Sequence, residues 1–355
     1  MKFAAKLLKL FELCKFYLHI CQKSSIFARN FENMTIALTT ELPKEGFKRL
    51  MEHGDELVLV HGSGSTVHGW QEAEVLVSTF DYRVSREMIE TMPNLRLIAN
   101  FGAGYNNIDL EACRERGIRV TNTPQPVIEP TAELAFALMI DIARRVSEFD
   151  RAVRAQQAEF GVMKNLSHSL YGKTLGIIGM GRIGQALARR AVASGMRIIY
   201  HNRHHLPDEI EQKYAAQYVD FQTLLQDSDY VSLNLPYTPE VHHIIGKPEL
   251  GMMKRSAYLI NTARGAHIHE EALIEALKNG IIAGAALDVY EQEQSVSLPT
   301  RGTIVPSELL ALPNVVLSPH TGTGTWEGRI AMCENVCDNI LAFMESDCNK
   351  MNIVL

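Results

Sequence analysis

The chain lacks the features that mark several common classes of protein. Its six cysteines form no CxxC pair and no spacing typical of a zinc finger, so reduced cysteines and a cytoplasmic location are expected. Basic residues number 35 against 41 acidic ones, and this balance argues against nucleic acid as the main partner. Long apolar runs are also missing, because Lys6, Lys9 and Lys15 interrupt those near the amino terminus, and no membrane partner is predicted.

Residues 1–33 differ in character from the rest of the chain. They are basic and amphipathic, and they lack the apolar core and small-residue cleavage site of a secretory signal. We expect a disordered or helical extension, either accessory or the product of a wrongly assigned start, with organelle targeting or attachment to a membrane surface as alternatives. The fold is predicted to begin at Met34, where a strand-like pattern starts.

What the chain does contain is a regular alternation of short apolar strands and amphipathic helices, which is typical of α/β proteins with parallel sheets. Its 355 residues suit about two domains. The predicted strands of the first unit are residues 36–39, 57–60, 75–78, 95–100 and 119–122.

A long predicted helix, residues 130–146, leads into a second α/β unit. The last predicted helix, residues 326–344, has too few companions to form a domain, so we expect it to pack back onto the first unit. This predicts one discontinuous domain of residues 34–130 and 323–355 and a second domain of residues 131–322. Towards the carboxyl end of the second unit, strands are predicted at residues 230–235, 258–262, 283–288 and 315–318.

The segment TLGIIGMGRIGQALARRAVASGMRIIYHNR, residues 174–203, carries the strongest functional signal. It has the pattern of a strand, a GxGxxG turn, a helix and a second strand, the context in which this motif binds dinucleotides. Gly179 permits the tight turn, Gly181 lets the backbone approach a pyrophosphate, and Gly184 lets the helix pack on the strand. The free N–H groups at the start of the helix would hold the phosphates.

The end of the second strand of this motif indicates the type of nucleotide. Proteins that bind NAD commonly have Asp or Glu there, which binds the ribose hydroxyls. Residues 201–205 contain no carboxylate, whereas Arg203 can pair with a 2′-phosphate and Asn202 can donate hydrogen bonds to it. We therefore expect NADP(H) as the preferred cofactor. NAD(H) is the alternative if Arg203 and the neighbouring histidines are only a solvated loop.

Three polar residues that suit redox chemistry on an anionic substrate follow three later strands. Arg264 follows the strand at 258–262, Glu293 follows the one at 283–288, and His320 follows the one at 315–318. The carboxyl ends of parallel strands converge on one crevice, so these three side chains are expected to meet there.

Several motifs resemble those of the D-isomer-specific 2-hydroxyacid dehydrogenases, in consistent order from Met34 to Met344. The chain is most similar to the glyoxylate/hydroxypyruvate reductase branch, partly because of the Asn202-Arg203 pair. The resemblance implies a flavodoxin-like substrate domain beside a Rossmann dinucleotide-binding domain. It is carried by NFGAGYNNID (100–109), TNTP, TAELAFALM (131–139), GMGRIG, SLNLPYTPE (232–240), INTARG (260–265), GAALDVYEQE (284–293) and NVVLSPHTG (314–322).

The resemblance implies a reductase of glyoxylate, hydroxypyruvate or a similar 2-oxo acid. Arg264 would bind the substrate carboxylate and carbonyl, and His320 would give a proton to the carbonyl oxygen. Glu293 would bond the other ring nitrogen, which orients the ring and favours its protonated form. Substrate-binding N–H groups would come from Phe101, Gly102, Ala103 and Gly104.

A set of cofactor contacts and a homodimer are also implied. Asp288 and the backbone of Ala263 would hold the nicotinamide carboxamide. The full set of cofactor-binding residues is Gly179, Gly181, Arg182, Ile183, Gly184, Asn202, Arg203, Leu235, Pro236, Thr262, Ala263, Asp288, His320 and Gly322.

The chain departs from the family in two places. Gln294 stands where relatives often have Pro and opens an unusually long loop, residues 294–307, which makes Glu293 the least secure of the three catalytic residues. Phe160 lies in a segment where relatives often carry Trp, which bears on the dimer contact.

No metal site is expected among the histidines. His267 and His269 have no carboxylate or cysteine nearby to complete a site, and His269-Glu270-Glu271 is typical of a helix start. The pairs at 204–205 and 242–243 are expected to be solvated.

Other functions remain as alternatives. One is an NAD-linked D-lactate or phosphoglycerate dehydrogenase, although few residues follow the last helix to form the regulatory domain of many phosphoglycerate enzymes. A formate dehydrogenase is disfavoured because that branch has Gln at the position of Glu293. A different class is a nucleotide-sensing binding protein like the C-terminal-binding corepressors, which share this fold.

Overall fold

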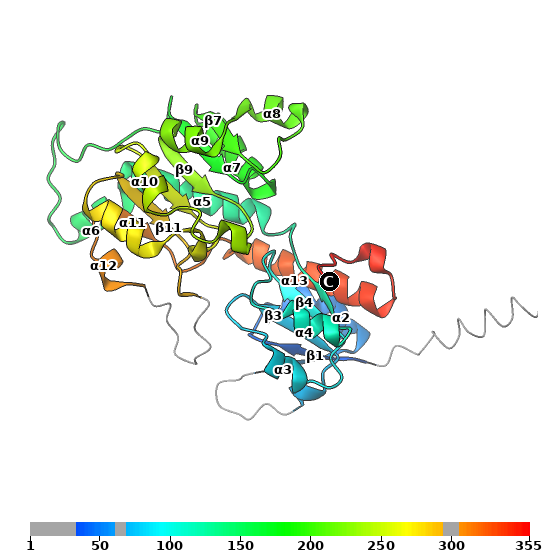
Figure 1. Cartoon of the computed structure of the whole chain (residues 1–355). Coiled ribbons are helices and arrows are strands. Elements are labelled where there is room, and N and C mark those ends of the chain that lie inside the picture. The colour runs from blue at the N-terminus through cyan, green and yellow to red at the C-terminus, as the bar shows by residue number, and fades with distance from the viewer. Residues whose placement is uncertain (1–32, 61–68, 294–304) are drawn as a thin grey trace, which may run out of the picture.

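The computed structural model describes residues 33–60, 69–293 and 305–355. Two parallel sheets with helices on both faces form two lobes (Figure 1). Residues 1–32 of the amino-terminal extension, residues 61–68 and residues 294–304 of the long loop lie outside the described residues.

The smaller sheet contains five strands in the order β2-β1-β3-β4-β5, and every pair is parallel. This is the strand order of flavodoxin-like sheets, as predicted. Its strands are short and apolar, and β3 and β4 are buried along their whole length. The strands are β1 (Thr35–Leu38), β2 (Glu56–Leu59), β3 (Val75–Thr79), β4 (Leu97–Phe101) and β5 (Arg119–Thr121).

The helices on this sheet come from both ends of the chain. The long helix α13 (Trp326–Met344) packs with η1 (Lys44–Phe47) and α2 (Lys48–His53) on one face. Their shared core includes Ile36, Phe47 and Val336, all fully buried. Helices α3 (Arg86–Glu90) and α4 (Leu110–Glu115) contribute to the core on the other face.

The larger sheet contains seven strands in the order β12-β11-β10-β9-β6-β7-β8, again all parallel. Counted from β6, its first six strands have the Rossmann order 3-2-1-4-5-6, with the topological switch between β6 and β9. The strands are β6 (Thr174–Ile178), β7 (Arg197–His201), β8 (Ala216–Tyr218), β9 (Tyr230–Leu233), β10 (Tyr258–Asn261), β11 (Gly284–Leu287) and β12 (Val315–Leu317).

Two cores cover the faces of this sheet. One is formed with α5 (Ile128–Arg144), α7 (Arg182–Ala193) and α8 (Asp208–Tyr214). The helices on the other face are α9 (Phe221–Asp227), α10 (Lys247–Met252), α11 (Glu270–Lys278) and α12 (Ser307–Leu310).

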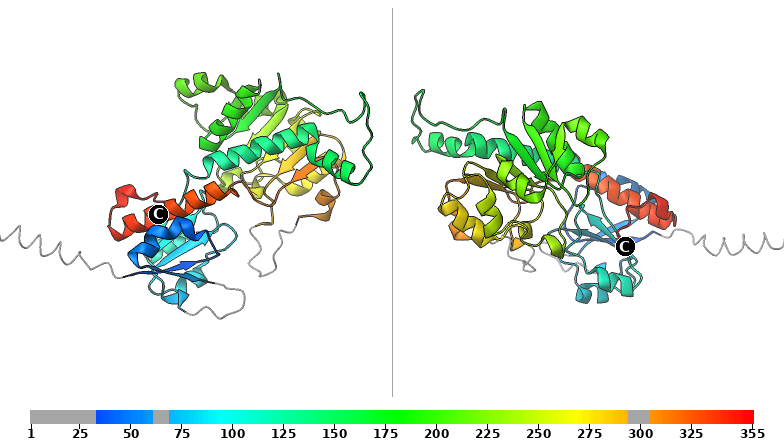
Figure 2. Two further views of the ribbon diagram at one scale, coloured as in Figure 1. Left: turned by 180° about the vertical axis from the view of Figure 1, so that it is seen from behind. Right: turned by 45° about the horizontal axis from the view of Figure 1, so that its top comes forward.

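Helix α13 extends from the junction of the lobes onto the smaller one (Figure 2). Ile183, in the first turn of α7, packs against cores of both sheets. The crevice at the carboxyl end of β6 therefore faces the smaller lobe, and this is where ligands bind in doubly wound folds. Among the described residues, no helix has the length and apolar character needed to cross a bilayer.

Candidate active site

The glycine turn between β6 and α7 has the geometry that its sequence predicts. Gly179 has φ +91°, and its N–H donates to the carbonyl of His201 at 3.0 Å. A Cβ on Gly184 would lie 2.6 Å from the Gly179 carbonyl oxygen, so only glycine allows this contact between helix and strand. A Cβ on Gly181 would meet no atom within 4 Å, which leaves space beside the start of the helix for a phosphate group.

Asn202 and Arg203 follow β7 next to this turn. The Asn202 side-chain oxygen accepts a hydrogen bond from the Met180 N–H at 2.7 Å, so Asn202 supports the turn with one end of its amide and leaves the NH2 end as a donor. Arg203 is exposed. The Thr238 side chain and, less strongly, the charge of Arg203 lower the pKa of the Glu240 carboxyl. An acid from another loop therefore lies within electrostatic reach of Arg203, although residues 201–205 contain none.

Further candidate cofactor contacts line the carboxyl edge of the sheet. Leu235 and Pro236 follow β9, and Thr262 and Ala263 follow β10. The Thr262 hydroxyl and the side-chain oxygen of Asn234 are buried without a hydrogen-bond partner among the described residues. Orphaned buried polar atoms beside an open glycine turn fit a nucleotide that would satisfy them.

Asp288 holds the segment that carries His320. Its two carboxylate oxygens accept hydrogen bonds from the N–H groups of Thr321 and Gly322, both at 2.8 Å, and its carbonyl accepts from the His320 N–H at 2.8 Å. His320 has φ +54°, a conformation that L-residues rarely adopt, and these bonds stabilise it. Asp288 thus positions this segment in addition to its expected role at the nicotinamide.

His320 and Glu293 form a hydrogen-bonded pair between Nδ1 of the ring and the carboxylate. The two side chains are only 19% and 13% exposed, which shields the pair from solvent. The Phe80 ring, from the smaller lobe, lies against the imidazole with ring centroids 3.9 Å apart. Nε2 of His320 therefore remains as the nitrogen that can reach a substrate.

Arg264 approaches the smaller lobe very closely. A Cβ on Gly104 would lie 1.8 Å from Nη2 of Arg264, so the missing side chain makes room for the guanidinium. Nη1 donates to the Ala263 carbonyl at 2.7 Å. Burial lowers the pKa of Arg264, and the charge of Glu293 opposes this shift. The guanidinium thus lies in a sheltered place where a carboxylate would be a strong partner.

The backbone at residues 101–104 offers fewer free donors than the sequence suggests. The Gly102 N–H donates to the Thr123 hydroxyl at 2.8 Å and to the Asn100 carbonyl at 3.0 Å. The N–H groups of Ala103 and Gly104 make no such bond within the described part of the chain. An anion beside Arg264 therefore has the N–H groups of Ala103 and Gly104 available, whereas that of Gly102 is occupied.

A pocket of about 530 Å³ opens between the lobes next to Glu293. Phe80, Asp81 and Arg83 form part of its wall. Glu293, which is bonded to His320, lines this pocket, and Phe80 lies against both the pocket and the imidazole. Arg264 lies beside Gly104 and within electrostatic reach of Glu293, so these side chains and the loop at 101–104 are near one another.

Comparison with known proteins identifies the family to which the chain belongs. Residues 136–322 match the family described as D-isomer specific 2-hydroxyacid dehydrogenase, NAD binding domain. The chain belongs to this family. A glyoxylate reductase of Thermococcus litoralis is 44% identical to it over 322 residues, which cover 88% of this chain and 94% of the relative.

Two solved structures of 2-hydroxyacid dehydrogenases show the same fold. An NADPH-dependent glyoxylate/hydroxypyruvate reductase from Sinorhizobium meliloti, in complex with NADP and malonate, has a TM-score of 0.76 at 29% identity, covering 89% of this chain and 95% of its own. A D-lactate dehydrogenase from Aquifex aeolicus, complexed with NAD and lactic acid, has a TM-score of 0.78 at 28% identity, with 90% and 98% covered. The predicted family is confirmed, and the protein is an NAD(P)-dependent oxidoreductase acting on CH–OH groups.

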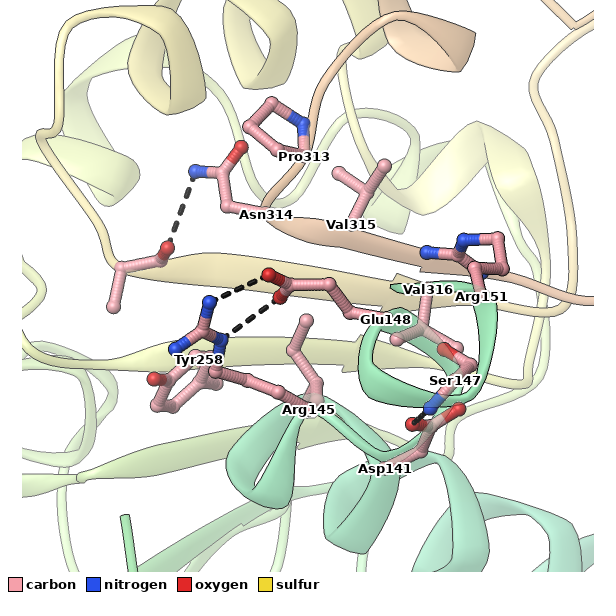
Figure 3. A pocket seen from close by; sticks show the side chains of 12 residues that line it. Asp141, Arg145, Ser147, Glu148, Arg151, Tyr258, Pro313, Asn314, Val315 and Val316 are labelled. Carbon is pink, nitrogen blue, oxygen red and sulfur yellow. Dashed lines mark hydrogen bonds and ion pairs between the residues drawn. The ribbon is translucent and has the colours of Figure 1, made fainter. Parts of the chain in front are cut away.

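A second pocket, of about 280 Å³, lies at the opposite edge of the larger sheet (Figure 3). It is lined by Tyr258, at the start of β10, and Val315, at the start of β12, together with the ion-paired side chains of Arg145 and Glu148. Ligands of doubly wound sheets bind at the carboxyl ends of the strands, so this pocket is not the dehydrogenase site.

Arg329, in α13, was not predicted from the sequence. Its guanidinium lies 5.6 Å from the centre of the Phe101 ring, and burial lowers its pKa while Asp81 opposes the shift. No ion pair joins it to another described residue. A half-buried cation next to the anion-binding loop is a candidate substrate contact, and only the packing of α13 against β4 reveals it.

The histidines outside the dehydrogenase site have different environments. The expectation that both residues of the 242–243 pair are solvated is wrong for His243, whose side chain is 27% exposed and is paired with Glu291. His269 is the N-cap of α11, which confirms the predicted helix start. His267 is fully buried, neither ring nitrogen has a hydrogen-bond partner among the described residues, and burial next to Arg264 lowers its pKa to about 4.

Proposed function

We propose that the protein reduces glyoxylate, hydroxypyruvate or a similarly small 2-oxo acid to the D-2-hydroxy acid, with NADPH as the preferred cofactor. The observation that carries this proposal is the meeting of Arg264, the Ala103 and Gly104 N–H groups and the His320–Glu293 pair at one cleft. A bound nicotinamide nucleotide supplies the hydride.

The chain's own residues bind the acid and move one proton. Arg264 and the N–H groups of Ala103 and Gly104 hold the carboxylate. Nη2 of Arg264 and both N–H groups have no acceptor among the described residues. Nε2 of His320 gives its proton to the 2-oxo oxygen. Glu293 fixes the ring and stabilises its positive charge through Nδ1.

A small substituent on the acid fits the surroundings of His320. The Phe80 ring covers the imidazole at 3.9 Å, and Asp81 places a negative charge in the adjacent wall. A large or acidic substituent would meet these groups, whereas the hydrogen of glyoxylate or the hydroxymethyl group of hydroxypyruvate would not. The name of the Thermococcus litoralis relative, glyoxylate reductase, points in the same direction.

Asn202 and Arg203 support the preference for NADPH. Arg203 is exposed after β7 with its guanidinium unpaired within the described residues, and the Asn202 amide is held by the glycine turn. The Sinorhizobium meliloti relative was solved with NADP. Glu240 weakens this preference, because it is an acid within electrostatic reach of Arg203.

Initial rates test the substrate and the cofactor together. We expect NADPH to support faster reduction of glyoxylate and hydroxypyruvate than of pyruvate or phosphohydroxypyruvate. Faster reduction of pyruvate with NADH would instead favour the D-lactate dehydrogenase alternative. Turnover that stays very slow with every acid would favour a nucleotide-sensing protein.

We also propose a homodimer in the cytoplasm. An arm after α6 (Val146–Arg154) exposes apolar side chains, including Phe160 at 89% and Val162 at 95%, which a second copy would cover. Cys113, Cys333 and Cys337 are free and buried, as expected in a reducing compartment. Light scattering on the eluting protein would measure the mass of the assembly.

A further inference from the structure

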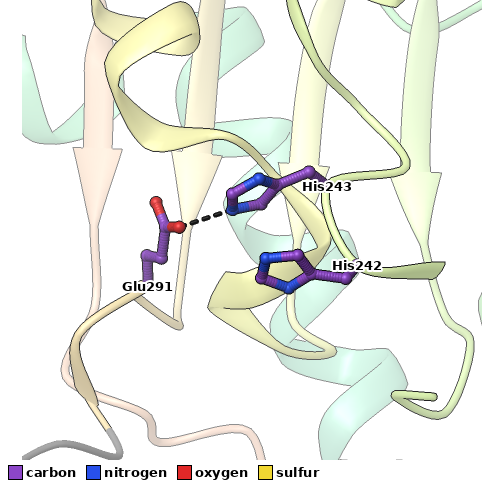
Figure 4. Close-up of side chains that lie close together, drawn as sticks. All are labelled: His242, His243 and Glu291. Carbon is purple, nitrogen blue, oxygen red and sulfur yellow. Dashed lines mark hydrogen bonds and ion pairs between the residues drawn. The ribbon is translucent and has the colours of Figure 1, made fainter. Parts of the chain in front are cut away.

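Three side chains that the dehydrogenase reaction does not use form a compact group on the larger lobe. His242 and His243 follow η3 (Pro239–Val241), and Glu291 follows β11 (Figure 4). Their possible metal-binding atoms all lie within 4.8 Å of one another. Nε2 of His243 lies 2.5 Å from the Glu291 carboxylate.

The backbone holds the two histidines on the same side. His243 has φ +51°, and this left-handed conformation stacks its ring on that of His242, with centroids 3.8 Å apart. The segment is paired with the chain before α11, because the His243 N–H donates to Ala266 at 2.8 Å and the His269 N–H donates to Ile245 at 3.0 Å. The arrangement is therefore built into the fold.

Neighbouring groups orient the three side chains. The Tyr237 hydroxyl lies 3.2 Å from Nδ1 of His242, which leaves Nε2 of that ring for a ligand. The second oxygen of Glu291 accepts a hydrogen bond from the Glu270 N–H at 3.2 Å. Supporting contacts of this kind fix the direction of metal-binding side chains in proteins.

We propose that His242, His243 and Glu291 bind a single Zn²⁺ ion or a similar transition metal. Two imidazole nitrogens and one carboxylate suit zinc, whereas magnesium and calcium prefer sites made of oxygen atoms. A tetrahedral zinc ion needs ligand atoms about 3.4 Å apart, so a small inward movement of the side chains completes the site. His242 is exposed, so the fourth position is open to water.

The metal replaces the hydrogen bond between His243 and Glu291. An imidazole nitrogen binds a metal only when it carries no proton, so zinc affinity should rise with pH. The ion joins the loop after β9 to the segment that also carries Glu293, two residues beyond Glu291. None of the residues assigned to the dehydrogenase reaction is a ligand, although Glu291 also lines the pocket next to Glu293.

The test is a zinc titration of the full chain without an affinity tag. Cys14, Cys21 and Cys348 are replaced by Ser in every sample, so that only the buried Cys113, Cys333 and Cys337 remain as thiols. Isothermal titration calorimetry after removal of metal with a chelator should give one Zn²⁺ per chain with a micromolar or lower Kd.

Matched variants assign the binding to these side chains. His243→Ala and Glu291→Gln should each weaken zinc binding at least 10-fold, while replacing both exposed histidines of the 204–205 pair with Ala should leave it unchanged. Circular dichroism and Tm without zinc confirm that each variant folds, and Glu291→Gln keeps the shape of the side chain. No binding at micromolar zinc, or equal Kd values in the wild type and both site variants, would overturn the proposal.

Discussion

Arg264 and Gly104 come from different lobes, yet a Cβ on Gly104 would lie 1.8 Å from Nη2 of the arginine. The guanidinium carried by one sheet therefore occupies space that the other sheet leaves empty. This contact links the two lobes directly, so a side chain at residue 104 should disturb Arg264.

Gly104→Ala should lower kcat/KM for glyoxylate by about 100-fold, because displacing the guanidinium by about 1 Å misplaces the substrate. Steady-state kinetics would measure the loss. The matched control is Gly251→Ala in α10, where a Cβ would meet no atom within 4 Å. Arg264→Ala should raise KM and lower kcat together. An active Gly104→Ala enzyme with unchanged KM would show that Arg264 does not bind the substrate here.

His320→Ala should reduce turnover by about 10²–10⁴-fold, the usual contribution of general acid catalysis. The Kd for NADPH, measured by fluorescence titration, should change little because the glycine turn and Asp288 remain. Glu293→Gln keeps the hydrogen bond to Nδ1 but removes the charge, so turnover should fall less than in His320→Ala. Near-native turnover in His320→Ala would eliminate this residue as the acid.

Arg203→Ala should raise the KM for NADPH about 10- to 150-fold and change the KM for NADH little, because it removes one charge-assisted contact of about 1.5–3 kcal/mol. Asn202→Asp keeps the acceptor for the Met180 N–H and adds a carboxylate, so it should shift the preference towards NADH. Glu240→Gln removes the acid near Arg203 and should shift the cofactor preference towards NADPH. A wild type that prefers NADH, or an Arg203→Ala variant that weakens both cofactors equally, would refute the NADPH assignment.

The buried His267 should make the fold sensitive to acid. Its pKa is about 4 in the folded protein against 6.5 when unperturbed, so its contribution to stability is full above pH 6.5 and is lost as the pH falls towards 4. The shift corresponds to about 3 kcal/mol. Urea unfolding at pH 7.5 and 4.5 measures the free energy of unfolding of both proteins. The value for His267→Leu should rise relative to that of the wild type when the pH is lowered to 4.5. With the exposed His204→Leu as control, a difference that stays constant with pH would contradict this account.

A chain that begins at Met34 should retain full specific activity. The Met34 N–H donates to the buried Asp55 carboxylate at 2.8 Å, and a new terminal ammonium group there would keep this partner. Activity and Tm of the shortened and full chains are the measurements. Loss of either would show that residues 1–33 contribute to the enzyme.

Buried apolar runs made most of the fold predictable. Each predicted strand overlaps an observed one, and α13 has the predicted bounds 326–344, because burial on both sides of a parallel strand leaves a clear apolar signal. The short edge strand β8 was missed, since its residues Ala216–Tyr218 are too few to show a pattern.

The details of the site depended on contacts between distant residues. The occupied N–H of Gly102 requires Thr123, and the half-buried state of His243 requires Glu291, 48 positions away. Arg329 approaches Phe101 only because α13 packs on the smaller sheet. A pattern of neighbouring residues in the sequence cannot predict contacts between residues so far apart.

Gly265 has a further consequence for the order of events in catalysis. A Cβ there would lie 1.9 Å from the backbone of Tyr290, so the residue next to Arg264 is pressed against the segment that leads to Glu293. Arg264, Glu293 and the glycine turn all belong to the larger lobe, whereas the N–H groups of Ala103 and Gly104 belong to the smaller one. If a nucleotide needs contacts from the larger lobe and an oxo acid needs both lobes, the kinetic mechanism should be sequential and ordered, with the coenzyme as the leading reactant and the last product to leave.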